Sequence, residues 1–466
     1  MPKPSQDKDY IPIPVNTGNF PDWQVRLGFS QLTNMFVGES GSVYTTPGLI
    51  KINTEAPDNG ARAVWESFFG TGAYFTVTDS EILKIDKNGN YTQLQSIRNS
   101  GQAVQIGENL QNQIGIVDGV SFWVIDQRLN DSVTLMGEEQ GFSFKTPISI
   151  VVLNTFCVVL DRDTKTWTVS DANNMLSFPP LDNVPQIGDQ LKEAVSLQTL
   201  SDNLYIFGTQ GIERWVPSIS NNPYLFAFTK DVNFRKDFGA IGTNSVVRGF
   251  DEIYFLSSKY VPMALSVNSG LRDIGPDKCS EGISRIISQY EDINFASGSF
   301  YTYKGNYFYS LTFPVTQKNW TYCQNSNTWA FNDDNIIASV QSGEVVATEN
   351  GLFKLSLIPN YKRRRWRSMR VTDDKGASPF RMSLNAAKAR IVQGILQQRE
   401  PQYIELSISK DSENFGNVVR RPIGLTGQRQ NETTWKMNMT GHEFTFLLSY
   451  DGNLDLTIES FSALIR

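Results

Sequence analysis

Short runs of alternating hydrophobic and polar residues, separated by tight polar turns, repeat through the middle of the chain. From about Ala73 to Leu357 an aromatic-rich strand, a turn and a second strand recur at intervals of roughly 38 to 54 residues. Turns such as Asn88-Gly89, Asp118-Gly119 and Asn350-Gly351 supply the positive φ that tight hairpins need. Because a single hairpin buries too little surface to be stable, the repeat predicts an all-β fold, a β-propeller of six or seven blades closed in a ring.

One stretch inside this region has helical instead of alternating spacing. In Ser280–Tyr290 the apolar residues fall at every third or fourth position: Ile283, Ile286, Ile287 and Tyr290. Glu281 in the first turn fits a helix start. We expect this helix to cover a sheet or a gap between blades.

The segments that flank the repeat have a different character. Residues 1–65 read as an extended N-terminal arm punctuated by prolines, with Tyr10, Pro12 and Pro14 as candidate contact residues. Such an arm either adds an edge to a neighbouring sheet or packs on its own domain. Residues 66–360 are assigned to the propeller, 361–380 to a basic linker and 381–466 to a β-sandwich with renewed strand alternation.

The linker contains the densest basic run of the chain. Its candidate contact residues are Lys362, Arg363, Arg364, Arg365, Trp366 and Arg367. Arg and Trp are favoured in protein contacts, so contact with a partner or a second subunit is the first interpretation. A solvated linker is the second, and non-specific contact with DNA phosphates is the third.

Length and composition restrict the class of protein. A chain of 466 residues is longer than a single hydrophobic core usually supports, so we expect two or three domains. The formal charge of −6 does not favour a protein that gathers DNA by its overall field, although DNA can slide past an acidic wall. No secretory signal or apolar membrane span is visible, so we expect a protein made in a reducing cytoplasm.

Residues that carry catalysis or bind metals are sparse. The cysteines Cys157, Cys279 and Cys323 are too few and too far apart for a disulfide framework or a zinc site, and His442 is the single histidine. Acidic pairs such as Glu138-Glu139, Asp333-Asp334 and Asp373-Asp374 are sequence neighbours, whereas glycosidase carboxylates face each other across a sugar. We therefore assign no catalytic residue, metal or cofactor.

Three blocks of sequence resemble the packaged-DNA stabilisation proteins, or tail hubs (nozzles), of short-tailed bacteriophages. The first comprises Asp9–Asn16, Tyr44–Lys51 and Gly60–Val64, with Asn16 and Pro47-Gly48-Leu49 as its most family-like part. The second is Ser266–Asn294. The third is the C-terminal segment with Leu406–Asn417, Thr434-Trp435-Lys436 and Leu454–Ile465.

The resemblance implies a structural protein of the virion tail, made in the cytoplasm of a host bacterium. Its implied form is a hexameric ring below the portal and its adaptor ring, in which the arm and the sandwich build the wall and the propellers lie outside. The ring would extend the channel for double-stranded DNA, retain the packaged genome and conduct it at ejection. A needle or plug would close the far end, and spikes or fibres would attach around it.

Two other classes stay open. One is a propeller-type tail protein that degrades or binds glycans, which would release sugar from a host polysaccharide. The other is a cellular propeller scaffold that binds peptides and runs as a monomer on a sizing column.

Overall fold

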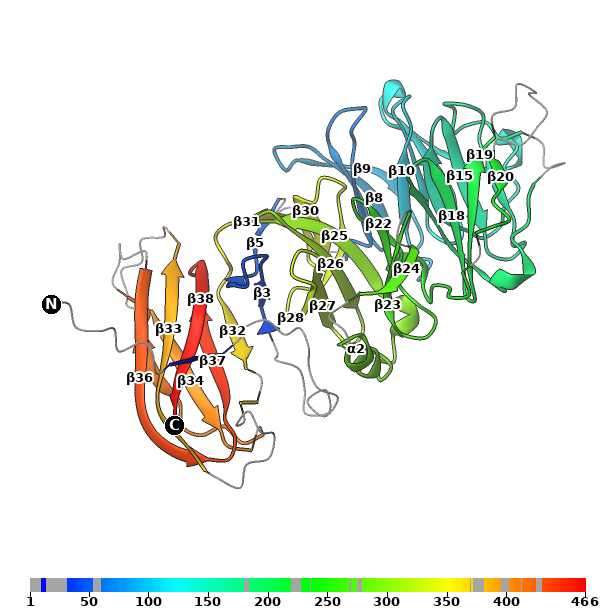
Figure 1. The fold of residues 1–466 in the computed structure, drawn as a ribbon. Coiled ribbons are helices and arrows are strands. Elements are labelled where there is room, and N and C mark those ends of the chain that lie inside the picture. The colour runs from blue at the N-terminus through cyan, green and yellow to red at the C-terminus, as the bar shows by residue number, and fades with distance from the viewer. Residues whose placement is uncertain are drawn as a thin grey trace.

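The chain folds into a β-propeller with a β-sandwich at one side of it (Figure 1). The computed structural model describes residues 10–13, 32–52, 60–179, 184–218, 228–234, 236–267, 270–274, 279–368, 370–371, 381–394, 402–411, 413–424 and 430–466. Nearly all regular structure is strand, as the sequence pattern predicts.

The first five blades follow one another along the chain as antiparallel meanders. Blades I and II are β6 (Ala63–Glu66), β7 (Tyr74–Val77), β8 (Glu81–Ile85) and β9 (Tyr91–Ser96), then β10 (Gln105–Glu108), β11 (Gln113–Val117), β12 (Phe122–Asp126) and β13 (Ser132–Leu135). Blade III is β14 (Pro147–Leu153), β15 (Phe156–Asp161) and β16 (Trp167–Val169). Blades IV and V are β17 (Ala194–Leu200), β18 (Asn203–Gly208), β19 (Ile212–Pro217) and β20 (Phe228–Lys230), then β21 (Val247–Arg248), β22 (Glu252–Leu256), β23 (Pro262–Ser266) and β24 (Gly270–Asp273).

The last two blades join the propeller to the rest of the chain. Blade VI is β25 (Ser297–Tyr303), β26 (Asn306–Phe313), β27 (Lys318–Cys323) and β28 (Thr328–Asn332). Blade VII is β29 (Ile336–Ser339), β30 (Val345–Thr348), β31 (Gly351–Ser356) and, from the N-terminal region, β5 (Gly48–Lys51). Short 3-10 helices lie between strands: η2 (Gln127–Leu129), η3 (Glu138–Gln140), η5 (Asp189–Leu191), η6 (Thr243–Ser245) and η7 (Ile293–Phe295).

The seven inner strands form a closed circle. Each of β6, β10, β14, β17, β21, β25 and β29 contacts the next, and β29 contacts β6. Hydrophobic clusters fill the spaces between neighbouring blades, for example Phe75 and Ile82 of blade I with Ile114 and Ile116 of blade II. The propeller is therefore seven-bladed, and its core is a set of layers between blades.

Strand β5 closes the ring by pairing antiparallel with β31, from Gly48 opposite Ser356 to Lys51 opposite Phe353. The boundary predicted at residue 65 is therefore wrong in two respects. Part of the N-terminal segment completes the last blade, and β6 already begins the first blade at Ala63. The physical reason is ring closure, because an outer strand from the other end of the chain ties the first and last blades together.

The sandwich is assembled from both ends of the chain. One sheet contains β1 (Ile11–Pro12), β3 (Met35–Val37), β4 (Val43–Thr45), β33 (Met382–Gln393), β36 (Gln430–Gly441) and β38 (Leu456–Ile465). The facing sheet contains β32 (Lys362–Arg367), β34 (Tyr403–Ser409), β35 (Val419–Pro422) and β37 (Thr445–Gly452). Large buried side chains fill the space between the sheets, among them Trp366, Trp435, Phe446 and Phe461.

The second sandwich sheet continues without interruption into blade VI. The two-residue strand β2 (Leu32–Thr33) lies between β28 of the propeller and β32 of the sandwich, and the combined sheet has nine strands. Thr33 is opposite Phe331 on one side and Arg365 on the other. The linker predicted at 361–380 is therefore wrong for Lys362–Arg367, which form a central strand of this sheet.

Helix α2 (Cys279–Ile287) confirms the single predicted helix. Ile283 and Ile287 pack against Tyr254 and Leu256 of blade V and Leu311 of blade VI, so the helix covers the gap between these blades. Within the described part of the chain, none of the helices has the length and hydropathy that a membrane span requires.

Candidate functional site

The basic strand β32 divides its side chains between the sandwich core and the solvent. Arg364 and Trp366 are 0% exposed, whereas Arg363 and Arg365 are exposed. This follows from strand geometry, in which successive side chains point to opposite faces of the sheet. The prediction that Arg364 and Trp366 belong to a contact surface is therefore wrong, because both lie inside the chain's own core.

Arg364 is a buried cation that links backbone segments to one another. Its Nη1 donates to the carbonyls of Lys362, at 3.1 Å, and Gly452, and its Nη2 donates to the carbonyl of Asn360 at 2.8 Å. Burial lowers the pKa of Arg364, while Tyr450 acts in the opposite direction. An arginine remains protonated in proteins, so a full charge sits at this point and is held by carbonyl dipoles.

Asn34 connects the propeller to the sandwich. Its Nδ2 donates to Asp333 Oδ2 at 2.5 Å and to the carbonyl of Arg363 at 2.8 Å, and its Oδ1 accepts from the Asp333 amide at 2.9 Å. The residue is fully buried and has φ of 56°, a conformation that asparagine tolerates better than most residues. One side chain therefore bonds directly to both domains.

Ion pairs surround this junction. Lys304, in the turn after β25, lies 2.6 and 2.7 Å from the two carboxylate oxygens of Asp455 in the sandwich. Thr45 donates to Asp455 Oδ1 at 2.9 Å, and Lys362 pairs with Asp334. These charges are partly shielded from water, so they hold the propeller and the sandwich in one relative orientation more strongly than exposed pairs would.

The described part of the N-terminal arm packs on its own chain. Ile11 and Pro12 pair with Ala463 and Ser462 of β38. The Lys388 ammonium lies 5.7 Å from the centre of the Tyr10 ring. For Tyr10 and Pro12 the structure therefore favours packing on the chain's own sandwich, while Pro14 lies outside the described residues.

The exposed part of β32 remains a candidate contact surface. Arg363 Nε lies 3.8 Å from Asp451, and the Arg367 guanidinium lies 5.5 Å from the Phe415 ring centre. Arg365 is exposed between them. These arginines share one face because they alternate with the buried residues of the strand.

Neutral side chains link the inner strands of blades II, III and IV. Gln105 of blade II donates to Ser196 Oγ of blade IV at 3.2 Å and to the carbonyl of Thr243, before blade V, at 3.4 Å. Ser149 of blade III donates to Gln105 Oε1 and accepts from the Leu197 amide at 2.8 Å. The Gln105 side chain therefore bonds to blade III through Ser149 and to blade IV through Ser196.

The acidic pairs of the sequence do not form one site. Glu138 and Glu139 lie in η3, Asp333 and Asp334 belong to the domain junction, and Asp373 and Asp374 lie outside the described residues. Within the described ranges, no group of three or more His, Cys, Asp and Glu side chains is placed to hold a metal ion. Cys157 is a buried core residue, as predicted, and burial raises the pKa of its thiol.

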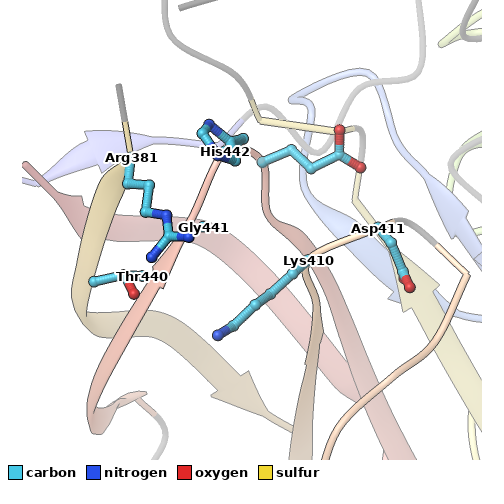
Figure 2. A pocket seen from close by; sticks show the side chains of 7 residues that line it. Arg381, Lys410, Asp411, Thr440, Gly441 and His442 are labelled. Atoms are coloured by element: carbon cyan, nitrogen blue, oxygen red, sulfur yellow. The ribbon is translucent and has the colours of Figure 1, made fainter. Parts of the chain in front are cut away.

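An open depression of about 560 Å³ lies at one end of the sandwich, where four strands begin or end. Its lining residues are Arg381, Lys410, Asp411, Thr440, Gly441, His442 and Glu443. Figure 2 shows Arg381 and Lys410 extending towards the space between them, whereas the Asp411 carboxylate points away from it. No sequence pattern predicts this cluster, because its members come from three separate segments of the chain.

The comparison of this chain with protein families gives one decisive match. Residues 29–336 match the family model described as "Bacteriophage P22 Gp10, beta-propeller", about two thirds of the chain. The chain belongs to the bacteriophage P22 Gp10 family. The predicted resemblance to this family is thereby confirmed, and the Gp10-family chain is a bacteriophage structural protein and a component of the virion.

Comparison with solved structures adds distant likenesses to other propellers. Virginiamycin B lyase from Staphylococcus aureus is 11% identical, with a TM-score of 0.45 over 66% of this chain and 99% of that chain. The propeller domain of Cps50 (Swd1) from Myceliophteria thermophila is 7% identical, with a TM-score of 0.43 over 67% and 98%. Neither likeness bears on the function of the Gp10-family chain. Among curated proteins, no match is found.

Proposed function

We propose that the protein is the tail hub, or nozzle, of a short-tailed phage. In this proposal six copies form a ring below the portal and its adaptor ring and extend the channel for double-stranded DNA. The ring retains the packaged genome and later conducts it at ejection. A needle or plug closes its far end, and spikes or fibres attach around it.

The observation that carries the proposal is the family match over residues 29–336. The N-terminal and C-terminal segments outside this match build most of the sandwich. We assign the ring wall to the sandwich and an outward position to the propeller. Rings of this kind form through head-to-tail contacts that close on themselves.

The junction supports such a role through its rigidity. A wall that must withstand packaged DNA needs domains that do not move relative to one another. The continuous sheet through β2, the buried Asn34 and the Lys304–Asp455 pair give that property. The exposed arginines Arg363 and Arg365 are the residues of β32 that we assign to contact with a neighbouring copy.

The alternative is a propeller that acts on or binds glycans. On the inner strands of blades II, III and IV, the polar side chains of Gln105, Ser149 and Ser196 bond to one another. These three side chains support a structural role for the inner strands, because they are engaged with one another. We therefore infer a protein that works without catalysis and without a cofactor.

Assembly on the adaptor ring is the test. Purified protein is mixed with the portal–adaptor complex of the same phage and examined by electron microscopy and native mass spectrometry. We expect six copies in a ring below the adaptor, with the propellers outside. A monomer that does not associate with the adaptor and that releases sugar from host polysaccharide would overturn the proposal in favour of the alternative.

Variants of the exposed arginines test the contact surface within that assay. Replacing Arg363 and Arg365 by Gln is expected to weaken ring assembly at least tenfold, with unchanged unfolding by urea. Lys354→Gln, an exposed charge on β31, serves as the matched control. Unchanged assembly of the double variant would show that this face contacts no subunit.

A further inference from the structure

The depression at the end of the sandwich is lined by charged and polar side chains from separate segments of the chain. Arg381 precedes β33, Lys410 follows β34, and His442 lies between β36 and β37. Among the described residues neither Arg381 nor Lys410 has a hydrogen-bonding or ion-pairing partner. The lining holds two cations, Arg381 and Lys410, and two carboxylates, Asp411 and Glu443, so an anion can bind here only if the carboxylates are engaged by other groups.

The two acidic residues at the depression are engaged elsewhere. Asp411 Oδ1 accepts from the amides of Glu413, at 3.1 Å, and Asn414, at 2.8 Å, and Oδ2 accepts from Asn414 Nδ2 at 2.8 Å. Hydrogen bonds from Asn414 and Ser409 hold the pKa of Asp411 below its usual value. The Glu443 carboxylate pairs with Arg370, outside the lining.

The lining also offers neutral hydrogen-bonding groups. Thr440 presents a hydroxyl beside the Arg381 guanidinium, as Figure 2 shows, and His442 lies at the rim of the same space. Guanidinium and ammonium groups with a hydroxyl donor are the usual ligands of phosphate. A volume of about 560 Å³ is within the range of small-molecule sites and leaves room for more than the phosphate group alone.

We propose that this depression binds the phosphate ester of a small polar molecule, such as a sugar phosphate. Arg381 and Lys410 bind the phosphate oxygens, and Thr440 and His442 contribute hydrogen bonds to the phosphate or its substituent. A concave site at the strand ends fits a compact ligand better than a DNA duplex, whose phosphates need an extended row of cations. The proposal is independent of the hub function, because it depends only on this end of the sandwich.

Calorimetric titration of the full chain with glucose 6-phosphate, glucose and inorganic phosphate tests the proposal. We expect saturable binding of the sugar phosphate, weaker binding of inorganic phosphate and none of glucose. Affinity should fall with added salt, because the site is open to solvent. If inorganic phosphate binds as tightly as glucose 6-phosphate, the claim that the substituent is bound is overturned. If glucose binds as tightly as glucose 6-phosphate, the claim of a phosphate site is overturned.

Substitutions locate the site. Arg381→Gln and Lys410→Gln are each expected to weaken sugar phosphate binding at least tenfold. Arg381→Lys keeps the charge but loses the planar guanidinium, so its affinity should lie between those of the parent and of Arg381→Gln. Lys354→Gln on blade VII is the matched control and should bind as the parent does. Unchanged binding in both site variants overturns the proposal. Since both residues are exposed, urea unfolding of each variant should match that of the parent.

A 20-base-pair duplex is the competing ligand. If the duplex binds more tightly than the sugar phosphate and the same substitutions remove its binding, the site is one for nucleic acid and the proposal fails. If the duplex does not displace the sugar phosphate, the proposal is supported.

Discussion

The propeller and the sandwich are both built from antiparallel strands, yet they depend on the chain in opposite ways. Blades I to V each come from one continuous segment, and each strand pairs with the next in sequence. The sandwich combines β1, β3 and β4 from the N-terminal end with strands from beyond residue 361, and β2 ties it to blade VI. This difference indicates that local hairpins form the blades, whereas a few buried polar residues set the relative orientation of the propeller and the sandwich.

Removing Arg364 should have the largest effect on this junction. Arg364→Ala leaves the carbonyls of Lys362, Asn360 and Gly452 without their donor inside the sandwich, and we expect a loss of about 3 kcal/mol in unfolding free energy. Urea unfolding followed by tryptophan fluorescence measures it. Arg365→Ala, the exposed neighbour, should change the value by less than about 0.5 kcal/mol. Equal effects of the two variants would contradict the assignment of Arg364 to the core.

Asn34 tests whether the junction depends on side-chain bonds or on backbone conformation. Asn34→Ala loses the bonds to Asp333 and Arg363 and strains a residue with φ of 56°, and we expect a loss of about 2 kcal/mol. Asn34→Gly relieves the backbone strain but does not restore the lost hydrogen bonds, so it should recover only part of the stability. Full recovery in the glycine variant would mean that the bonds contribute nothing.

Closure of the propeller should be sensitive to Gly48. A Cβ at this position would lie 1.9 Å from the carbonyl oxygen of Ile358, so Gly48→Ala must shift β5 or the backbone at Ile358 and thereby loosen the packing of β5 on blade VII. We expect a loss of about 1.5 kcal/mol and faster amide exchange in β29–β31. Gly60→Ala, whose nearest neighbour would lie 3.9 Å away, is the control. Unchanged exchange in blade VII of Gly48→Ala would show that β5 does not hold the ring closed.

The smallest expected effect is a pH dependence inside one blade. Burial alone would raise the pKa of Asp161, but hydrogen bonds from Thr164, Thr146 and Asp163 outweigh it and hold the pKa below its ordinary value. A carboxyl with a lowered folded pKa stabilises the fold above its unfolded pKa and loses that contribution as pH falls through the folded pKa. We therefore expect stability to drop by about 1 kcal/mol as the pH falls below about 4.

The Asp161→Asn variant checks the origin of that drop. It should be less stable than the parent at pH 7, and the difference should narrow towards pH 2, because the amide does not titrate. The urea unfolding midpoints of the parent and the variant, measured at pH 7 and at pH 2, give this stability difference. A difference that stays constant would assign the acid sensitivity to other carboxyls.

The sequence predicted the blades well because their signals are local. The predicted turn Asn88-Gly89 lies between β8 and β9, and the turn Asp118-Gly119 lies between β11 and β12. The run around Arg364 was misassigned because a dense group of cations is usually solvated. Its burial depends on carbonyls at Asn360 and Gly452, and the second of these lies far along the sequence.

Asn34 and Gln105 carried no sequence signal for the same reason. Asn34 bonds to Asp333, which is 299 positions away, and Gln105 bonds to Ser196, which is 91 positions away. A single polar residue in a sequence does not indicate which distant residue it will bond to. The depression at the end of the sandwich was also hidden, because Arg381, Lys410 and His442 line one space only when the sandwich has formed.

The two-residue strand β2 has a mechanical consequence. Its bonds to β28 on one side and β32 on the other make blade VI and the sandwich parts of a single sheet. We expect a pull on the outer blades to load this hydrogen-bonded ladder in shear, so that the propeller and the sandwich turn together as one body.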